Sequence, residues 1–420
     1  MFVEFRVSNF MSIKEEACLS LVAGRGQEHR ETHLVTPVAA NEDATYETLV
    51  RTTVIYGANA AGKTNLLFGL LVMVSIVTRS HQDPEVLHSI TPFKFDPGCK
   101  NSATTFEVIF IAGGIRYQYG FAASDEKVLR EWLYAWPRGR RQTWLERDGQ
   151  SFFFGPGLKG AKKVWENATR QNALFLSTAV ALNSEQLRPL FHWFDQTLVM
   201  ANSGFSPTIS RAYSQDARKR KVLEFLIAAD FAIADIRVEE KEITPEEWGD
   251  DAPEELRAWV QRFGPKTHTT DFFGHAPKPG GPVVELTMAE ESAGTAKMYC
   301  FAGPIDHALQ NGQIVVIDEM NKSLHPALVQ YLVDLFHDPD RNVSGAQLVF
   351  ATHDISILNQ DTFRRDQVWF CERNPQQETQ LYSLLEFRPR KEWEDLERAY
   401  LAGRYGAIPY IRTHVRPMDT

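Results

Sequence analysis

The chain has 420 residues, of which 43% are hydrophobic and 24% charged, so it can bury one large core or two moderate ones. With 26 glycines and 21 prolines, its composition is not that of a disordered protein. The formal net charge of −9 argues against a protein that coats nucleic acid through bulk positive charge. Two local basic clusters, at 138–141 and 218–221, are interpreted as a solvated loop and a solvated helix face.

The cysteines and the N-terminus indicate in which cellular compartment the protein is expected. Four cysteines are widely separated and form no CxxC or Cys/His pattern, which excludes a disulfide framework and a zinc site and fits a reducing cytosol. The first residues, MFVEFRVSNF, contain no apolar signal core, and no apolar run reaches transmembrane length. We therefore expect a cytoplasmic protein with no membrane partner.

The N-terminal part, residues 1–130, is predicted to be rich in strands. Residues 2–8 alternate as a strand does, and Ser12 lies in the predicted turn to a second strand. A strand at 52–56 runs into GANAAGKT and then into an apolar helix, NLLFGLLVMVSIV. Three further strands are predicted, TPFKF, TTFEVIFI and GIRYQYGFA, and the last two are joined by an Ala-Gly-Gly hairpin turn.

The pattern changes in the middle of the chain, from 131 to 282. Helices are predicted at 185–196 and 215–230, and a charged, Pro/Gly-rich stretch at 243–282 is predicted to be loop-rich. We interpret 131–282 as an inserted, largely helical region. From 283 to 420 the order of strand, turn, helix and strand returns, which predicts a third part of the chain.

The stretch GANAAGKT, residues 57–64, fits the phosphate-binding loop G-x-x-x-x-G-K-[ST], with a strand before it and a helix after it. Its backbone N–H groups would wrap a phosphate at the positive end of the helix. Lys63 would bridge the β- and γ-phosphates, and the Thr64 hydroxyl would bind Mg²⁺. A plain glycine turn is the alternative. The predicted ATP-binding residues are Gly57, Asn59, Ala60, Gly62, Lys63, Thr64 and Asn65.

Two later strands end in residues that suit the same chemistry. IVVIDE at 314–319 ends in Asp318, predicted to hold Mg²⁺ through water, and Glu319, predicted to orient or deprotonate the attacking water. QLVFATHD at 347–354 places His353 at the carboxyl end of a strand, where open α/β sheets bind ligands, and predicts a γ-phosphate sensor. Taken alone, each of these two motifs could be an ordinary strand end without a function. With the loop they predict a catalytic set of Lys63, Glu319 and His353.

The spacing of these motifs points to a family. Lys63 and Asp318 are 255 residues apart, whereas Asp318 and His353 are only 35 apart. This order of loop, long insertion, Ser-x-Gly turn, acidic strand and histidine strand resembles the ABC-type ATPase head of the SMC, RecF and OLD-like group. The resemblance implies an α/β fold with a mixed or parallel core sheet, an antiparallel N-terminal β-subdomain and a largely helical insertion.

The stretch EESAGTAKMY at 290–299 acquires a role from that resemblance. In the family, a serine-glycine signature turn caps the ATP bound by a second copy of the domain. The resemblance therefore implies that Ser292 and Gly294 contact the γ-phosphate held by Lys63 of a facing copy, with Lys297 adding positive charge. The usual LSGGQ-like signature reads ESAGT here, and an ordinary helix cap is the alternative. The expected partner is a second copy in an ATP-sandwich homodimer or a higher oligomer.

Two further family elements are less distinct. Residues 321–326, NKSLHP, resemble the D-loop region that crosses the dimer interface, with Ser323 and His325 as candidates, or they simply start a helix at Pro326. No Q-loop glutamine is identified, because Gln82 follows Lys63 too closely and Gln118 lies in a predicted strand.

A narrower resemblance rests on five stretches: FRVSNFMSIKEEACLSLVAG, ITPFKFDP, EESAGTAK, DEMNKSLHP and YLAGRYGAIPYI. Together they are similar to the OLD-like AAA-family ATPases of phage-defence operons, such as RloA, AbiLi and AriA of PARIS. OLD-type nucleases carry a Toprim domain after the ATPase, and the 67 residues after His353 are too few for one. The resemblance implies a slow ATPase that acts as sensor or scaffold. Its expected effector is a separate toxin or nuclease, RloB-like or Toprim-like, and its trigger DNA or a phage component.

Three other functions are alternatives to a sensor or scaffold ATPase. A RecF-like repair or recombination ATPase would dock duplex DNA through the basic clusters. A standalone nuclease is disfavoured because no acidic metal-binding cluster is evident, and an ABC transporter subunit is disfavoured by the size of the insertion.

Overall fold

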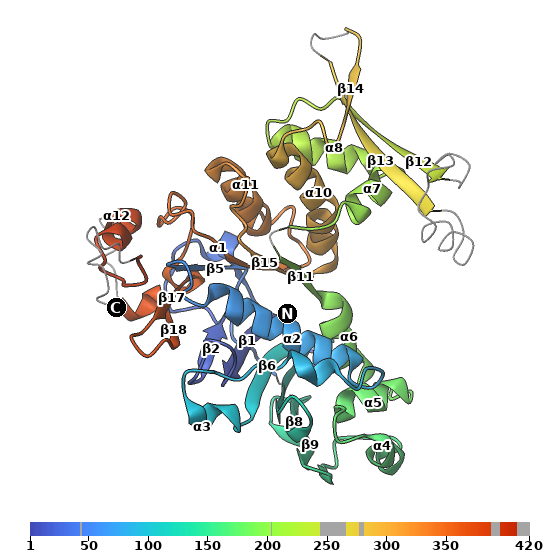
Figure 1. Ribbon diagram of the computed structural model, residues 1–420, viewed down its shortest axis with the longest axis vertical. Coiled ribbons are helices and arrows are strands. Elements are labelled where there is room, and N and C mark those ends of the chain that lie inside the picture. The colour runs from blue at the N-terminus through green and yellow to red at the C-terminus, as the bar shows by residue number, and fades with distance from the viewer. Residues whose placement is uncertain (43, 203, 244–265, 277–280, 388–394, 410–420) are drawn as a thin grey trace, which may run out of the picture. The chain divides into compact units, whose positions relative to one another are not determined.

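A computed structural model describes the chain except residues 43, 203, 244–265, 277–280, 388–394 and 410–420 (Figure 1). The chain divides into two compact units. The first comprises 1–203, 308–322 and 329–420, and the second comprises 204–307 and 323–328.

The core of the first unit is a six-stranded sheet that is mostly parallel. Its central strands are mostly apolar and almost completely buried, as expected for parallel strands covered on both faces. Only the last strand, β18, is antiparallel to its neighbour. The sheet order is β11 (Leu198–Asn202), β15 (Ile314–Asp318), β16 (Gln347–Ala351), β5 (Thr52–Gly57), β17 (Val368–Arg373) and β18 (Thr379–Ser383).

A second, seven-stranded sheet of the first unit is antiparallel. Helix α2 (Lys63–Arg79), which follows the phosphate loop, contacts β5 and β15 of the core sheet and β1 and β6 of this sheet. The alternating side chains of β6 bury Phe106, Val108 and Phe110 in the main core. The order is β10 (Ser151–Phe154), β9 (Gln142–Asp148), β8 (Val128–Trp136), β7 (Ile115–Ala123), β6 (Thr104–Ala112), β1 (Phe2–Ser8) and β2 (Ala17–Ser20).

The strand predicted at TPFKF, residues 91–95, is wrong. The segment is an irregular loop held by Asn9, whose Oδ1 accepts a hydrogen bond of 3.1 Å from Phe93 N. Met11 N also donates to Thr91 O at 2.8 Å. These bonds to the turn after β1 replace the ladder that a strand would need.

The remaining elements of the first unit are short, apart from α11. The helix predicted at about 326–337 is present as α11, whose first residues belong to the second unit. The bounds are α1 (Arg30–His33), β3 (Leu34–Val35), β4 (Leu49–Val50), α3 (Pro97–Lys100), α4 (Lys162–Ala168), α5 (Phe175–Ala181), α6 (Arg188–His192), α11 (Pro326–His337) and α12 (Leu396–Leu401), with single turns at Val86–Ser89, Trp193–Thr197, Arg365–Gln367 and Leu384–Phe387.

The second unit is a three-stranded antiparallel sheet with helices. Its core includes Asp271, which is 2% exposed and accepts hydrogen bonds from Arg211 at 2.9 and 2.7 Å. Strand β13 lies inside the stretch predicted to be loop-rich, so that prediction is wrong for 266–275. The rest of the stretch lies largely outside the described residues. The elements are α7 (Thr208–Ser214), α8 (Lys219–Ala228), β12 (Asp235–Ile243), β13 (Lys266–His275), β14 (Val284–Thr287) and most of α10 (Ala293–Asn311).

The predicted fold class is confirmed: a mixed α/β core sheet carries the loop, and a separate antiparallel sheet includes the N-terminal strands. The middle of the chain contributes helices, as expected. It also supplies β9 and β10 to the antiparallel sheet and β11 to the core sheet, where Asn202 is paired with Asp318.

Three histidine rings stack in the first unit. The ring centroids of His29 and His33 are 4.5 Å apart, and those of His33 and His337 are 3.5 Å apart, with interplanar angles of 14°. His33 and His337 both hydrogen-bond the side chain of Gln367. Burial lowers the pKa of His33 to about 4, with smaller contributions from His29 and Arg364. Burial likewise lowers the pKa of His337 well below its usual value.

We expect this stack to make stability depend on pH. Between pH 6.5 and about 4 an unfolded chain binds protons at His33 and His337 that the folded chain does not bind. The free energy of unfolding should therefore fall as pH falls below 6.5, by about 1.4 kcal/mol per pH unit and histidine. Urea denaturation at a series of pH values gives the slope of the unfolding free energy against pH. His33→Phe should show a shallower slope than the wild type, whereas His88→Phe, at an exposed position, should keep the wild-type slope. Equal slopes in all three proteins would contradict this account.

Candidate nucleotide-binding site

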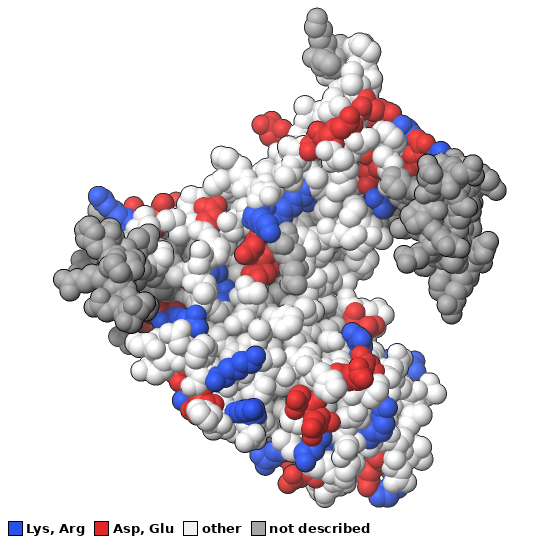
Figure 2. Space-filling model, in the orientation of Figure 1, with Lys and Arg blue, Asp and Glu red and all other residues white. Residues whose placement is uncertain are grey.

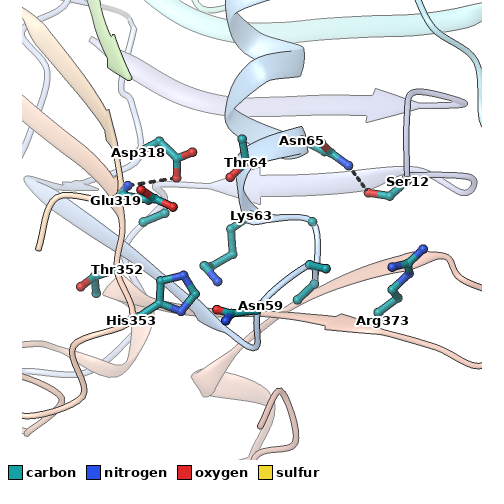
Figure 3. Close-up of a pocket in the computed structure, with 14 residues that line it drawn as sticks. Ser12, Asn59, Lys63, Thr64, Asn65, Asp318, Glu319, Thr352, His353 and Arg373 are labelled. Carbon is teal, nitrogen blue, oxygen red and sulfur yellow. Dashed lines mark hydrogen bonds between the residues drawn. The ribbon is translucent and has the colours of Figure 1, made fainter. Parts of the chain in front are cut away.

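Three neighbouring parallel strands bring the predicted residues to one edge of the core sheet. The phosphate loop follows β5, Thr352 and His353 follow β16, and Asp318 ends β15, directly before Glu319. Because these strands run in the same direction, their carboxyl ends meet, as in other ligand-binding α/β sheets. Together they line a cavity of about 480 Å³ (Figure 3), with Ser12, Asn59, Ala60, Ala61, Gly62, Lys63, Thr64, Asn65, Ala351 and Arg373.

Both glycines of the loop are required by the packing of β17 and β18. A Cβ on Gly57 would lie 2.3 Å from the backbone oxygen of Cys371. Gly62 has φ +107°, and a Cβ there would lie 2.0 Å from Thr379 Oγ1. That hydroxyl donates a hydrogen bond of 2.9 Å to Ala61 O and so fixes the end of the loop. The packing of β17 and β18 therefore constrains the conformation of the loop.

We expect Gly62→Ala to destabilise the protein by about 2–4 kcal/mol, because strain from the positive φ and overlap with Thr379 add. Gly113→Ala is the matched control. Gly113 also has positive φ, but nothing lies within 4 Å of its added Cβ, so only the strain of about 1–2 kcal/mol applies. Urea denaturation of both variants measures the difference. Equal losses of stability would show that packing of the loop on β18 contributes nothing.

Lys63 is held within the loop that precedes it. Its Nζ donates to Gly57 O at 2.7 Å and to Ala58 O at 3.1 Å, and the residue is 6% exposed. Burial lowers the pKa of Lys63, while the nearby Cys371, Asp318 and Glu319 act in the opposite direction. An anion entering the cavity would therefore meet an ammonium that is partly desolvated, where a charge-assisted contact is strong.

The two acidic residues differ in their surroundings. Asp318 ends the buried strand, and its Oδ1 accepts a hydrogen bond of 3.0 Å from the backbone N–H of Glu319. Glu319 has φ +48°, a left-handed conformation that non-glycine residues seldom adopt. Met320 N then bonds Ala351 O at 3.0 Å, which holds this turn against β16. Such strain is maintained where the surroundings over-determine it, often at functional sites.

His353 lies exposed on the cavity side of the loop after β16. Its backbone N–H donates to Asn321 Oδ1 at 3.3 Å, which connects the histidine to the loop after Glu319. Partial burial and then the charge of Lys63 lower the pKa of His353, against the effect of Glu319 and Asp318. The imidazole is therefore neutral at pH 7 and able to donate a single hydrogen bond.

Sequence reasoning missed residues at the other end of the cavity. Ser12 and Arg373 line it although they are far from the loop in the sequence. Ser12 Oγ accepts a hydrogen bond of 2.6 Å from Asn65 Nδ2, a bond drawn in Figure 3. A signal existed for Arg373, because it is a cation at the carboxyl end of a run of strand-forming residues, VWFCE.

The predicted signature residues, Ser292 and Gly294, lie in the second unit. Ser292 caps α10: its Oγ accepts a hydrogen bond of 3.0 Å from Thr295 N. A Cβ on Gly294 would approach Ser323 O at 3.3 Å. His325 caps α11, since its Nδ1 accepts a bond of 3.2 Å from Ala327 N.

No glutamine is among the residues that line the cavity. Gln118 instead bonds Glu107 on the antiparallel sheet, at 2.9 Å. Within the described ranges, no helix is long and apolar enough to span a membrane. In the same ranges, no three His, Cys, Asp or Glu residues form a group that could hold a metal ion.

The fold and this edge of the sheet define an α/β protein with a phosphate-binding loop. The chain belongs to the family described as "AAA domain, putative AbiEii toxin, Type IV TA system", which matches residues 52–359, more than half of its length. No curated protein matches the chain.

Among solved structures, the chain is similar to two SMC head domains. One is the SMC head bound to the C-winged helix domain of ScpA, with 10% identity, 91% of this chain and 97% of that chain covered, and a TM-score of 0.39. The other is the SMC head domain from Thermotoga maritima, with 12% identity, 91% and 98% covered, and a TM-score of 0.37.

Proposed function

We propose that the chain binds ATP with Mg²⁺ and hydrolyses it slowly. The observation that carries this proposal is the convergence of Lys63, Thr64, Asp318, Glu319 and His353 on one cavity. The Thr64 hydroxyl and the Asp318 carboxylate are oxygen ligands of the kind Mg²⁺ prefers, alongside substrate phosphates. When bound, Mg²⁺ neutralises charge on the β- and γ-phosphates.

The residues of the chain then have distinct roles in the proposed reaction. The backbone N–H groups of the loop and the Lys63 ammonium hold the phosphates. The Glu319 carboxylate orients a water molecule and accepts its proton. The neutral imidazole of His353 donates a hydrogen bond to the γ-phosphate.

We further propose that two copies dimerise head-to-head around two ATP molecules. The N-terminus of α10 supports this role, because a 19-residue helix with small residues in its first turn presents backbone N–H groups and a favourable dipole to a phosphate. Ser292 and Gly294 would contact the γ-phosphate bound by the facing copy.

The biological role that we propose is control of a separate effector, a nuclease or toxin, in bacterial anti-phage defence in the cytoplasm. It is supported by the resemblance to defence ATPases and by the family description, which mentions a toxin–antitoxin system. Nucleotide state would set dimer geometry and thereby retain or release the effector.

Phosphate release by the purified chain with ATP and Mg²⁺ tests the enzymatic part. Hydrolysis that disappears in Lys63→Ala would support the proposal, and absence of both ATP binding and hydrolysis would contradict it. If the effector is a separate protein, the purified chain alone should leave DNA and RNA intact. Nuclease activity that co-purifies with the wild-type chain, and is lost when the chain is mutated, would contradict the proposal that the nuclease is a separate protein.

The alternative of a RecF-like DNA-binding ATPase finds little support in the charges. Each cation of the 218–221 cluster has a carboxylate partner: Arg218 pairs with Asp216, Lys219 with Asp235, Arg220 with Glu224 and Lys221 with Asp306. In the 138–141 cluster, Arg141 stacks on Tyr134 at 3.7 Å. On the face shown in Figure 2, acidic and basic side chains are interspersed. Tight duplex binding that weakens steeply with salt would revive this alternative.

A further inference from the structure

The cavity has two chemically different ends. Figure 3 shows Asp318, Glu319 and His353 on one side of Lys63, and Ser12 and Arg373 on the other. If Glu319 and His353 act on the terminal phosphate, as proposed above, that phosphate lies on the acidic side of the cavity. The other side of the cavity, past Asn65 and lined by Ser12 and Arg373, is then open to the ribose and base of the nucleotide.

Three segments that are distant in the sequence build this second end. The backbone N–H of Thr379 donates to Ser12 O at 2.7 Å, which joins β18 to the turn after β1. Lys14 Nζ lies 3.1 Å from Asp96 and 3.1 Å from Glu378, so it connects the 91–97 loop to the hairpin between β17 and β18. These contacts involve two of the stretches, FRVSNFMSIKEEACLSLVAG and ITPFKFDP, that carried the family resemblance but had no role in the phosphate site.

Arg373 and Phe95 meet at the mouth of this end. The guanidinium of Arg373 lies over the ring of Phe95, 5.8 Å from its centroid. Phe95 is 62% exposed, which is unusual for an aromatic ring with no role in the core. Within the described part of the chain, Arg373 has no carboxylate at ion-pair distance, although it is exposed and lines the cavity. Planar guanidinium groups stack on aromatic faces and on bases.

We propose that the Arg373 guanidinium, backed by Phe95, is the platform on which the base of the nucleotide stacks. This inference rests on the proposed nucleotide binding. It makes Arg373 the residue that favours a ligand with a base, such as ATP, over a polyphosphate without one. Arg373 would act through its flat face, whereas Lys63 acts through its charge.

The test compares ATP with inorganic triphosphate, which lacks a base, in titration calorimetry with Mg²⁺. The variants are Arg373→Lys, which keeps the charge and loses the plane, and Arg373→Trp, which keeps a plane and loses the charge. Arg373→Lys should weaken ATP binding about tenfold, within the range measured for stacking, and leave triphosphate binding unchanged. Arg373→Trp should retain ATP affinity. Arg140→Ala, a change at an exposed arginine that does not line the cavity, should have no effect.

Two results would overturn the inference. If Arg373→Lys binds ATP normally while Arg373→Trp loses both ligands, Arg373 is a phosphate contact. If none of the variants changes ATP affinity, the base lies elsewhere. Failure of the wild-type chain to bind either ligand is a different result, because it would contradict the proposed function itself.

Discussion

Replacing Lys63 by alanine should weaken ATP·Mg²⁺ binding about 100-fold, equivalent to about 2.7 kcal/mol. The substitution removes the buried ammonium that the cavity offers to the β- and γ-phosphates, and hydrogen bonds to charged groups are the strong ones. It also removes the two bonds from Nζ to Gly57 O and Ala58 O that support the loop. Titration calorimetry measures the loss.

The control for this variant is Lys100→Ala, a lysine on the surface of the same unit. It has the same change in net charge and should bind ATP as the wild type does. The thermal midpoints of both variants should show that each remains folded. Unchanged affinity in a folded Lys63→Ala protein would mean that the cavity is not a phosphate site.

Glu319→Gln should slow hydrolysis by about 10²–10⁴-fold and leave ATP affinity within about threefold of the wild-type value. The range is that of general acid–base catalysis, and glutamine keeps the size of the side chain while losing the proton acceptor. The left-handed backbone at φ +48° remains compatible with the new residue about as well as with glutamate. Single-turnover phosphate release reports the chemical step.

Glu146→Gln, on the exposed face of the antiparallel sheet, is the control and should hydrolyse ATP at the wild-type rate. A Glu319→Gln protein that hydrolyses ATP normally would remove Glu319 from the proposed mechanism. A parallel loss of ATP affinity and of hydrolysis would instead assign Glu319 to nucleotide or metal binding.

The parts of the fold that could be predicted are those in which local sequence and tertiary structure agree. The β5 run, the phosphate loop and α2 form one local unit with an unambiguous motif, and the apolar runs of β15 and β16 are continuous, as buried parallel strands are. Their carboxyl ends carry Asp318 and His353, so the acidic side of the site follows from the sequence.

The base side of the site could not be predicted because it depends on long-range contacts. Arg373 and Phe95 are brought together by contacts between distant segments, which include the Lys14 ion pairs and the pairing of β17 with β5. Similarly, β11 was missed because it is a short run whose partner, β15, is more than a hundred residues away. TPFKF has the composition of a strand, but the Asn9 side chain holds it as a loop.

The central claim is that ATP brings two copies together, with Ser292 of one acting on the nucleotide of the other. Light scattering of Glu319→Gln with and without ATP·Mg²⁺ tests it most directly, because this variant should bind ATP without consuming it. The account predicts that ATP raises the mass, or locks an existing dimer against dilution, and that adding Ser292→Arg abolishes the effect. A mass that is indifferent to ATP, in protein shown to bind it, would contradict the sandwich and leave Ser292 as an ordinary cap of α10.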